Sequence, residues 1–207
     1  MMSDEYFTIK GPAQHTTIIK KSKFISNVLP VENQDEAEKY IDSLRKKYWD
    51  ATHNVYAFTI GLNDETQKFS DDGEPSGTAG KPVLEVIKSK ALKNVLVVVT
   101  RYFGGILLGA GGLIRAYSES AAGGLNEAGI VKKIKYDIYE VKVDYNQLGK
   151  LQWEINQKGL FISDINFSQD VLMKVCVPVN SALNFKEFIM NITSGLANMK
   201  WLNQGYM

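Results

Sequence analysis

The spacing of hydrophobic residues changes repeatedly along the first 133 residues, as expected for a chain that mixes strands and helices. Runs rich in Thr, Ile, Val and Phe predict strands over Glu5–Ile9, Thr16–Leu29, Val55–Ile60 and Val95–Val99. Apolar residues at intervals of three or four predict helices over Ala37–Tyr48, Pro82–Lys90 and Leu113–Leu125. Because Val95–Val99 is apolar throughout, we expect a strand that is buried on both faces.

A new pattern begins after Lys132–Lys135, a basic stretch that we interpret as a linker. Alternation over Tyr139–Tyr145 predicts a strand, and the spacing of Leu148, Leu151 and Ile155 predicts a helix. Two strands, a helix and a final strand follow over residues 162–168, 171–178, 182–193 and 199–202. The order βαββαβ is that of a ferredoxin-like domain. The sequence therefore predicts an α+β protein of two domains, residues 1–133 and 136–207.

Composition and charge limit the classes of protein to which this chain can belong. The chain has 207 residues, is 44% hydrophobic and carries a net charge of +1, so nucleic-acid binding would require a local basic patch. The single cysteine, Cys176, lies in an alternating run that predicts a buried strand thiol. No apolar run approaches the roughly 20 residues of a membrane span, and the first residues lack the order of a signal peptide. We therefore expect a cytoplasmic protein that does not act at a membrane.

A glycine-rich junction follows the strand over Val95–Val99. It consists of Arg101, Tyr102, Phe103, Gly104 and Gly105, with Gly109, Gly111 and Gly112 shortly after. Neither the dinucleotide-binding nor the P-loop pattern fits these glycines. Free N–H groups at a helix start, with Arg101 before them and Arg115 after them, could still hold an anion. The alternative is that the glycines only permit tight packing.

Residues 70–80 form a second polar, glycine-rich stretch that contains Asp71, Asp72 and Glu74. These carboxylates could bind a cation or a basic partner, but Asp, Gly, Pro and Ser also form turns without any ligand. The spacing does not fit a calcium-binding loop. His53 stands alone at the start of a strand, without a second histidine at ligand spacing, so we expect no metal site and no cofactor.

Lys20, Lys21 and Lys23 form a basic cluster within the segment Thr16–Leu29. Lysines on an edge strand prevent sheets from pairing with one another, and they can equally extend a surface that binds an anionic ligand. The pattern supports both interpretations.

The sequence contains no motif of a catalytic nucleophile. Ser118 and Ser120 lie inside a predicted helix rather than in a Gly-x-Ser-x-Gly turn, and the chain has only two histidines. We therefore predict no catalytic residue from the sequence.

Several of these stretches together resemble the YigZ/Impact family. They are Lys21–Phe24, His53–Asn54, Asp72–Gly80, Arg101–Gly105, Leu108–Gly109 and Gly111–Leu113. The resemblance covers nearly the whole chain and implies a first domain similar to domain 2 of ribosomal protein S5. It implies a second domain similar to the last domain of elongation factor G. Eukaryotic members of the family regulate translation by binding the activator of a stress-responsive initiation-factor kinase, whereas nucleic-acid binding has been suggested for the bacterial proteins.

Three functions are consistent with these observations. The first is a non-enzymatic, translation-associated protein that binds RNA or a ribonucleoprotein through the junction over Arg101–Gly112. Here Arg101 and Arg115 would contact phosphate, Tyr102 or Phe103 would stack on bases or pack inside, and the three lysines would extend the surface. The second is a protein-interaction module that uses the acidic loop over Asp71–Glu74. The third is an unrecognised enzyme, which requires His53, Glu74 and Arg101 to share one cleft.

Overall fold

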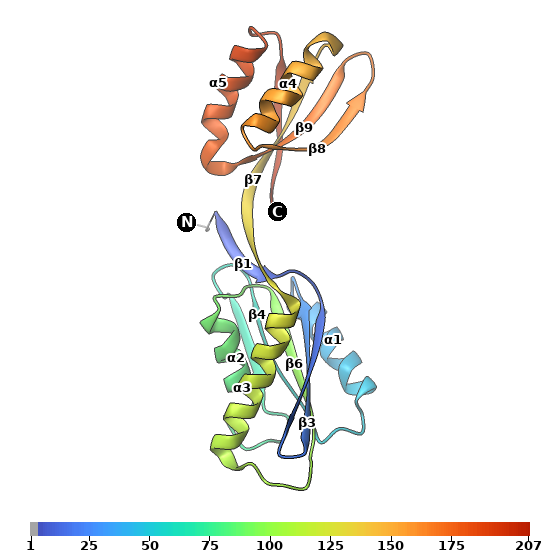
Figure 1. Cartoon of the computed structure of the whole chain (residues 1–207), viewed down its shortest axis with the longest axis vertical. Helices are drawn as coiled ribbons and strands as arrows, with labels where there is room; N and C mark the ends of the chain where they lie inside the picture. The colour runs from blue at the N-terminus through green and yellow to red at the C-terminus, as the bar shows by residue number, and fades with distance from the viewer. Residues whose placement is uncertain (1–3) are drawn as a thin grey trace. The chain divides into compact units, whose positions relative to one another are not determined.

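The computed structural model describes residues 4–207 and has a mixed α+β architecture. The chain divides into two compact units, one that ends at Lys132 and one that begins at Lys133 (Figure 1). Each unit has its own hydrophobic core. None of the helices in the described part of the chain is long and apolar enough to cross a membrane.

The first unit is built on a five-stranded antiparallel sheet with the order β2-β3-β6-β4-β5. Its strands are β2 (Ala13–Ile19), β3 (Ser22–Pro30), β4 (His53–Ile60), β5 (Thr66–Ser70) and β6 (Val95–Tyr102), and β1 (Glu5–Ile9) precedes them. Its helices are α1 (Gln34–Lys47), α2 (Gly80–Ser89) and α3 (Gly109–Ala128).

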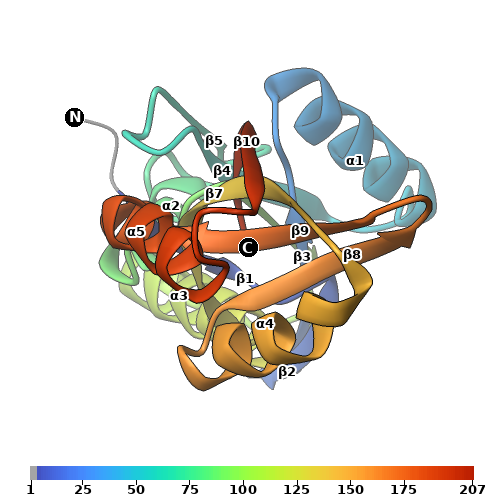
Figure 2. The same cartoon turned by 90° about the horizontal axis from the view of Figure 1, so that it is seen from above.

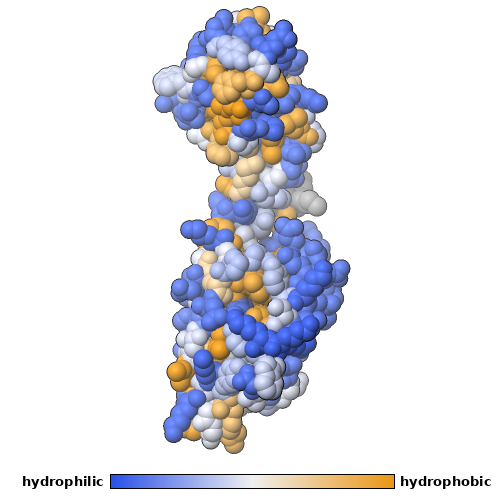
Figure 3. Space-filling model, turned by 90° about the vertical axis from the view of Figure 1, so that its right-hand side faces the viewer, coloured by the Kyte–Doolittle hydropathy of each residue, from blue (hydrophilic) through white to orange (hydrophobic). Residues whose placement is uncertain are grey.

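The central strand β6 is buried on both faces, as its unbroken apolar run predicts. Val95, Val97 and Val99 point into the core formed with α2 and α3, whereas Leu96 and Val98 point into the core under α1. Since α1 contributes only Ala37 and Ile41 as buried residues, its outer face is polar. Figure 3 accordingly shows a largely hydrophilic surface on that side of the first unit.

Two features of the first unit differ from the sequence-based prediction. The strand β5 was not predicted, because an exposed edge strand needs few apolar residues and Thr66–Ser70 has only one, Phe69. Lys20 and Lys21 do not lie on an edge strand. They form the two-residue turn between β2 and β3, with φ values of 45° and 67°. Left-handed conformations at both positions are typical of hairpin turns that twist with their strands.

The second unit has the predicted βαββαβ order: β7 (Ile130–Val143), α4 (Tyr145–Gln157), β8 (Phe161–Phe167), β9 (Val171–Pro178), α5 (Ala182–Ile192) and β10 (Asn198–Tyr206). The four strands of this unit lie side by side in the order β10-β7-β9-β8, within a five-stranded sheet in which β1 also pairs with β7. A short 3₁₀ turn, Val179–Ser181, precedes α5. Figure 2 shows α4 and α5 together beside β8 and β9, where Leu151 and Ile189 enter the core. Cys176 is buried on β9, as predicted.

The basic stretch Lys132–Lys135 connects the two units, as predicted, because the boundary between them falls after Lys132. It is a strand rather than a loop, since it lies inside β7. Lysines with long aliphatic stems are compatible with a strand, so their charge alone did not reveal this. The likenesses to domains of ribosomal protein S5 and of elongation factor G stay predictions.

Candidate functional site

The junction after β6 and the start of β4 lie next to each other in the sheet of the first unit. His53, the first residue of β4, pairs in register with Arg101 near the end of β6. The loop between β5 and α2 brings Glu74 to the same place, and α3 contributes Tyr117. Four residues that are far apart in the sequence therefore form one cluster.

Glu74 is the centre of this cluster. Its Oε1 accepts hydrogen bonds from Arg101 Nη1 at 2.6 Å and from the Tyr117 hydroxyl at 2.7 Å. The side chains of Glu74 and Arg101 are 3% and 6% exposed, so this is a buried ion pair. Burial and the hydrogen bond to Glu74 raise the pKa of Tyr117 far above its usual value, which keeps the hydroxyl protonated as a donor.

Arg101 is also held between two aromatic rings. The centres of the Phe24 and Phe103 rings lie 5.5 and 5.6 Å from its guanidinium carbon. A planar guanidinium interacts favourably with ring faces at this distance. Its Nε is enclosed and has no hydrogen-bond partner among the residues that the structure describes. Arg101 thus retains one donor that the protein leaves unused.

The orientation of His53 is defined by the backbone. Its Nδ1 lies 2.7 Å from the carbonyl oxygen of Asp72. Since a carbonyl oxygen only accepts, Nδ1 carries the proton and donates it. The other nitrogen, Nε2, lies 3.8 Å from Glu74 Oε1. In the neutral ring Nε2 is therefore an acceptor.

The acidic loop is ordered by its own carboxylates. Asp71 accepts hydrogen bonds from the backbone N–H groups of Gly77, Ala79 and Gly80, at and just before the start of α2. Asp72 accepts one from the N–H of Asn54 at 2.6 Å and pairs with Arg45 at 3.1 Å. With Glu74 paired to Arg101, all three carboxylates of this loop already have partners within the protein.

Gly104 and its neighbours attach the junction to the rest of the sheet. A Cβ atom on Gly104 would lie 2.0 Å from the carbonyl carbon of Lys21, so only glycine fits against the β2–β3 turn. The N–H of Gly104 donates to Ser22 Oγ, and the N–H of Phe103 donates to Thr52 Oγ1. Gly105, with φ of 81°, continues the turn.

A cleft of about 430 Å³ opens over the cluster. Its lining combines His53, Glu74 and Arg101 with apolar side chains and with the first residues of α3. No side chain caps the N-terminus of α3, and its first turn contains no acidic residue. This arrangement can bind a small polar or anionic group, although it does not itself supply a reaction.

Two domain families match this sequence. The Impact N-terminal domain matches residues 20–125, and a domain of unknown function (DUF1949) matches residues 141–196. The chain is 43% identical over 199 residues to IMPACT family member YvyE of Bacillus subtilis, covering 96% of this chain and 92% of that protein. The chain belongs to the IMPACT family.

Further members of the IMPACT family extend the comparison. IMPACT family member YigZ of Escherichia coli is 33% identical, covering 89% of this chain and 93% of that protein. Protein IMPACT of Rattus norvegicus is 40% identical over 94 residues, which are 44% of this chain and 29% of that protein. A solved structure titled as that of a hypothetical protein is 28% identical, with a TM-score of 0.63, and covers 97% of this chain and 98% of its own.

The hypothesis of an unrecognised enzyme requires His53, Glu74 and Arg101 to share one cleft. In this IMPACT family member all three residues line the same cleft. The other predicted binding residues take different places. Lys20, Lys21, Lys23 and Arg115 are exposed, Phe103 is half exposed, and the Tyr102 hydroxyl donates to Asp50. Among residues 4–207, no group of three His, Cys, Asp or Glu side chains is arranged to hold a metal ion.

The prediction that Arg101 contacts a phosphate on the surface needs correction. Its side chain is buried and paired with Glu74, because the β6 register directs it inward. Likewise, the acidic loop offers no free carboxylate to a basic partner, since Asp71, Asp72 and Glu74 are already bonded. Sequence reasoning also missed Tyr117, which it placed only in the apolar stripe of α3. A hydroxyl in an otherwise apolar stripe was the available signal.

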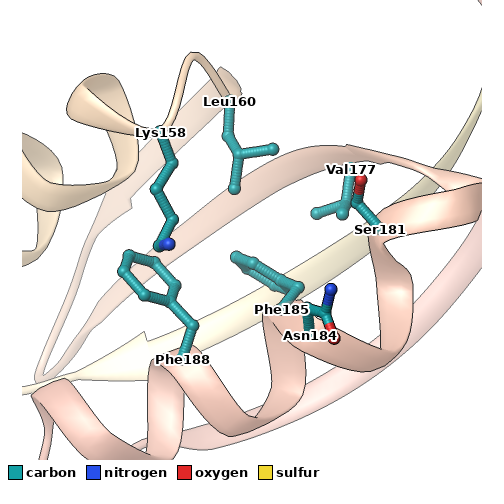
Figure 4. A pocket seen from close by; sticks show the side chains of 7 residues that line it. All are labelled: Lys158, Leu160, Val177, Ser181, Asn184, Phe185 and Phe188. Carbon is teal, nitrogen blue, oxygen red and sulfur yellow. The ribbon is translucent and has the colours of Figure 1, made fainter.

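A second, smaller cleft of about 220 Å³ lies in the second unit, between α5 and the end of α4 (Figure 4). The rings of Phe185 and Phe188 and the side chain of Leu160 form its apolar part. Lys158 Nζ lies 4.6 Å from the ring centre of Phe188. None of the residues predicted from the sequence to bind a ligand lies in this cleft.

Proposed function

We propose that this IMPACT family member is a non-enzymatic, translation-associated protein of the cytoplasm that binds RNA or a ribonucleoprotein. The binding surface is the end of the first unit where β6 passes into α3. The observation that supports it is the exposure of Lys20, Lys21 and Lys23 directly beside the backbone of residues 102–104. Figure 1 shows the β2–β3 turn and the start of α3 at this same end of the unit.

The three lysines provide the local basic patch that a chain of nearly zero net charge requires. In the described part of the chain no carboxylate pairs with them, so their charges are available to phosphates. Lysine contacts to phosphate add affinity without sequence preference. Phe103, 45% exposed at the edge of the patch, offers a ring on which a base can stack.

Arg101 has a supporting role in this proposal. Its guanidinium lies behind the Phe103 ring and holds it from the inside, while Glu74 neutralises the charge. Arg115 lies on the exposed side of α3 and remains a candidate phosphate contact. Replacing Arg101 would therefore disturb the fold and the surface together, so it is unsuitable as a binding test.

The test replaces Lys20, Lys21 and Lys23 together by Gln and measures binding of fluorescein-labelled single-stranded RNA by anisotropy at several salt concentrations. Each phosphate contact contributes about 0.7 to the slope of log K against log salt for single strands, so losing three should reduce the slope by about 2. The affinity for RNA at low salt should also fall.

The control replaces Lys10, Lys39 and Lys88 by Gln, three exposed lysines elsewhere on the same unit. This variant has the same net charge but should keep the slope of the wild type. Equal slopes for the two triple variants, or wild-type binding that does not respond to salt, would refute the proposal.

A further inference from the structure

The Glu74 carboxylate presents a free hydrogen-bond acceptor to the cleft that it lines. Its bonds from Arg101 and Tyr117 both go to Oε1, and no described residue donates to the second oxygen, Oε2. The side chain is only 3% exposed, but Oε2, unlike Arg101 Nε, is not fully enclosed. Since Glu74 lines the cleft, Oε2 is a nearly buried acceptor that faces it.

His53 adds a second acceptor beside the first. Its Nδ1 donates to the carbonyl oxygen of Asp72, so Nε2 of the neutral ring has a free lone pair. Nε2 lies 3.8 Å from Glu74 Oε1 and receives no hydrogen bond from the part of the chain that the structure describes. His53 lines the same cleft. Two neighbouring acceptors without a donor favour a ligand that brings two neighbouring donors.

The charges around these acceptors favour a neutral ligand over a cation. Arg101 already neutralises Glu74, and Arg45 pairs with Asp72. The first residues of α3 also line the cleft, and the N-terminus of a helix carries a partial positive charge. An ammonium or guanidinium group of a ligand would therefore bring a further positive charge without a free carboxylate to compensate for it.

The rest of the lining is mainly apolar and includes one aromatic ring. Phe103, Leu107 and Leu113 contribute to it. The Phe103 ring is held by the Arg101 guanidinium, whose carbon lies 5.6 Å from the ring centre, and the residue is still 45% exposed. Such a ring can stack with a flat aromatic ligand. The cleft, at about 430 Å³, is within the roughly 300–1,000 Å³ that small-molecule sites occupy.

We propose that this cleft binds a guanine base, which stacks on Phe103 and donates its N1–H and 2-amino group to Glu74 Oε2 and His53 Nε2. Among the four RNA bases, only guanine has two neighbouring donors on its Watson–Crick edge. Adenine and cytosine place an acceptor next to their donor, and uracil places its donor between two acceptors. These three bases would therefore bring an acceptor against the carboxylate or the imidazole, which is unfavourable.

The inference rests on the proposed RNA-binding function and names the base that the protein would recognise. Unpaired bases of RNA are commonly bound by stacking on an aromatic side chain and by hydrogen bonds to their Watson–Crick edge. The guanine belongs either to a free nucleotide or to an unpaired guanosine in an RNA strand.

The first test changes the ligand and leaves the protein intact. Isothermal titration calorimetry on the full chain compares the 5′-monophosphates of guanosine, inosine and adenosine, which share the same sugar and phosphate. Inosine differs from guanosine only in lacking the 2-amino group. A hydrogen bond to a charged group corresponds to about tenfold or more in affinity, so guanosine monophosphate should bind at least about tenfold more tightly than the other two.

The second test removes one acceptor from the protein. His53→Phe keeps a flat ring but has no ring nitrogen, so the affinity for guanosine monophosphate should fall by about three- to tenfold. The matched control is His15→Phe, which makes the same exchange on β2, outside the cleft, and should keep the wild-type affinity. Thermal unfolding shows whether each variant is folded. A folded His53→Phe with full affinity, or an equal loss in both variants, would contradict the proposal, and the ligand series decides independently of either variant.

Uridine hexamers that carry one guanosine, inosine or adenosine distinguish the two sources of guanine. A preference of at least about tenfold for the guanosine hexamer over the inosine hexamer assigns a base within an RNA strand. The same preference among the monophosphates alone assigns a free nucleotide, and it would stand even if RNA binding proved insensitive to salt. If neither series separates guanosine from inosine, the guanine site is refuted. Salt-dependent hexamer binding that requires the three lysines would in that case leave the proposed function standing.

Discussion

At the scale of single residues, burial decides what Arg101 can do. On the surface an arginine beside an aromatic pair would contact phosphate, but here Glu74, Tyr117 and two rings surround it. A buried ion pair adds little net stability compared with an apolar pair, yet removing one partner leaves the other charge buried and uncompensated. Glu74 is therefore more important for keeping Arg101 in place than for any exposed chemistry.

This argument predicts the effect of Glu74→Gln. The amide keeps the shape of the side chain but removes its charge, so the free energy of unfolding of the first unit should fall by about 3–5 kcal/mol. Urea denaturation followed by circular dichroism measures it. The matched control is Glu38→Gln, since Glu38 is half exposed and pairs with Lys68, and it should cost less than about 1 kcal/mol. Similar losses in both variants would contradict the role given to Glu74.

At the scale of elements, the β2–β3 hairpin and the junction after β6 depend on each other. The turn at Lys20 and Lys21 presents two lysines in a left-handed conformation that glycine or asparagine usually adopts. The backbone at Gly104 packs directly against this turn. Residues held in rarely populated conformations occur often at functional sites, and this turn carries the proposed phosphate contacts.

Two glycines of this region should respond to substitution in opposite directions. Gly104→Ala would push a methyl group into the backbone of Lys21, so we expect a loss of about 1–3 kcal/mol in stability. Gly111→Ala meets open space within α3 and should stabilise the helix by roughly 0.5–1 kcal/mol. Thermal unfolding compares both variants with the wild type. A stabilising Gly104→Ala would show that the turn and the junction are not in contact in solution.

At the scale of the whole molecule, each unit has a core of its own. Val97, Leu125 and Ile87 belong to the first core, and Leu151, Met173 and Ile189 belong to the second. Cores that share no residues favour units that unfold in separate steps, so a single free energy of unfolding does not describe this chain.

The substitution Leu151→Ala tests the separation of the units. Leu151 is fully buried, so the cavity should destabilise the second unit by about 2–5 kcal/mol. Hydrogen exchange followed by mass spectrometry should show faster exchange in peptides from residues 133–207 and no change in residues 4–132. Leu183→Ala, at an exposed position of α5, is the matched control. Equal acceleration in both units would mean that they unfold together.

The sequence alone determined the α+β class, the two domains with the βαββαβ order in the second, and the resemblance to the IMPACT family. These properties follow from local patterns, because the spacing of apolar residues reflects which face of a strand or helix is buried. The strand β5 escaped prediction since an exposed edge leaves little apolar signal.

Only the tertiary structure decided which side chains meet. The strand register places His53 beside Arg101, and loop and helix packing bring Glu74 and Tyr117 to them. Tertiary packing also buries Arg101, which we expected at a binding surface. Lys20 and Lys21 lie in a turn, whereas the sequence suggested an edge strand. The physical reason is that burial and pairing depend on contacts between distant segments, and residue type and local spacing do not specify those contacts.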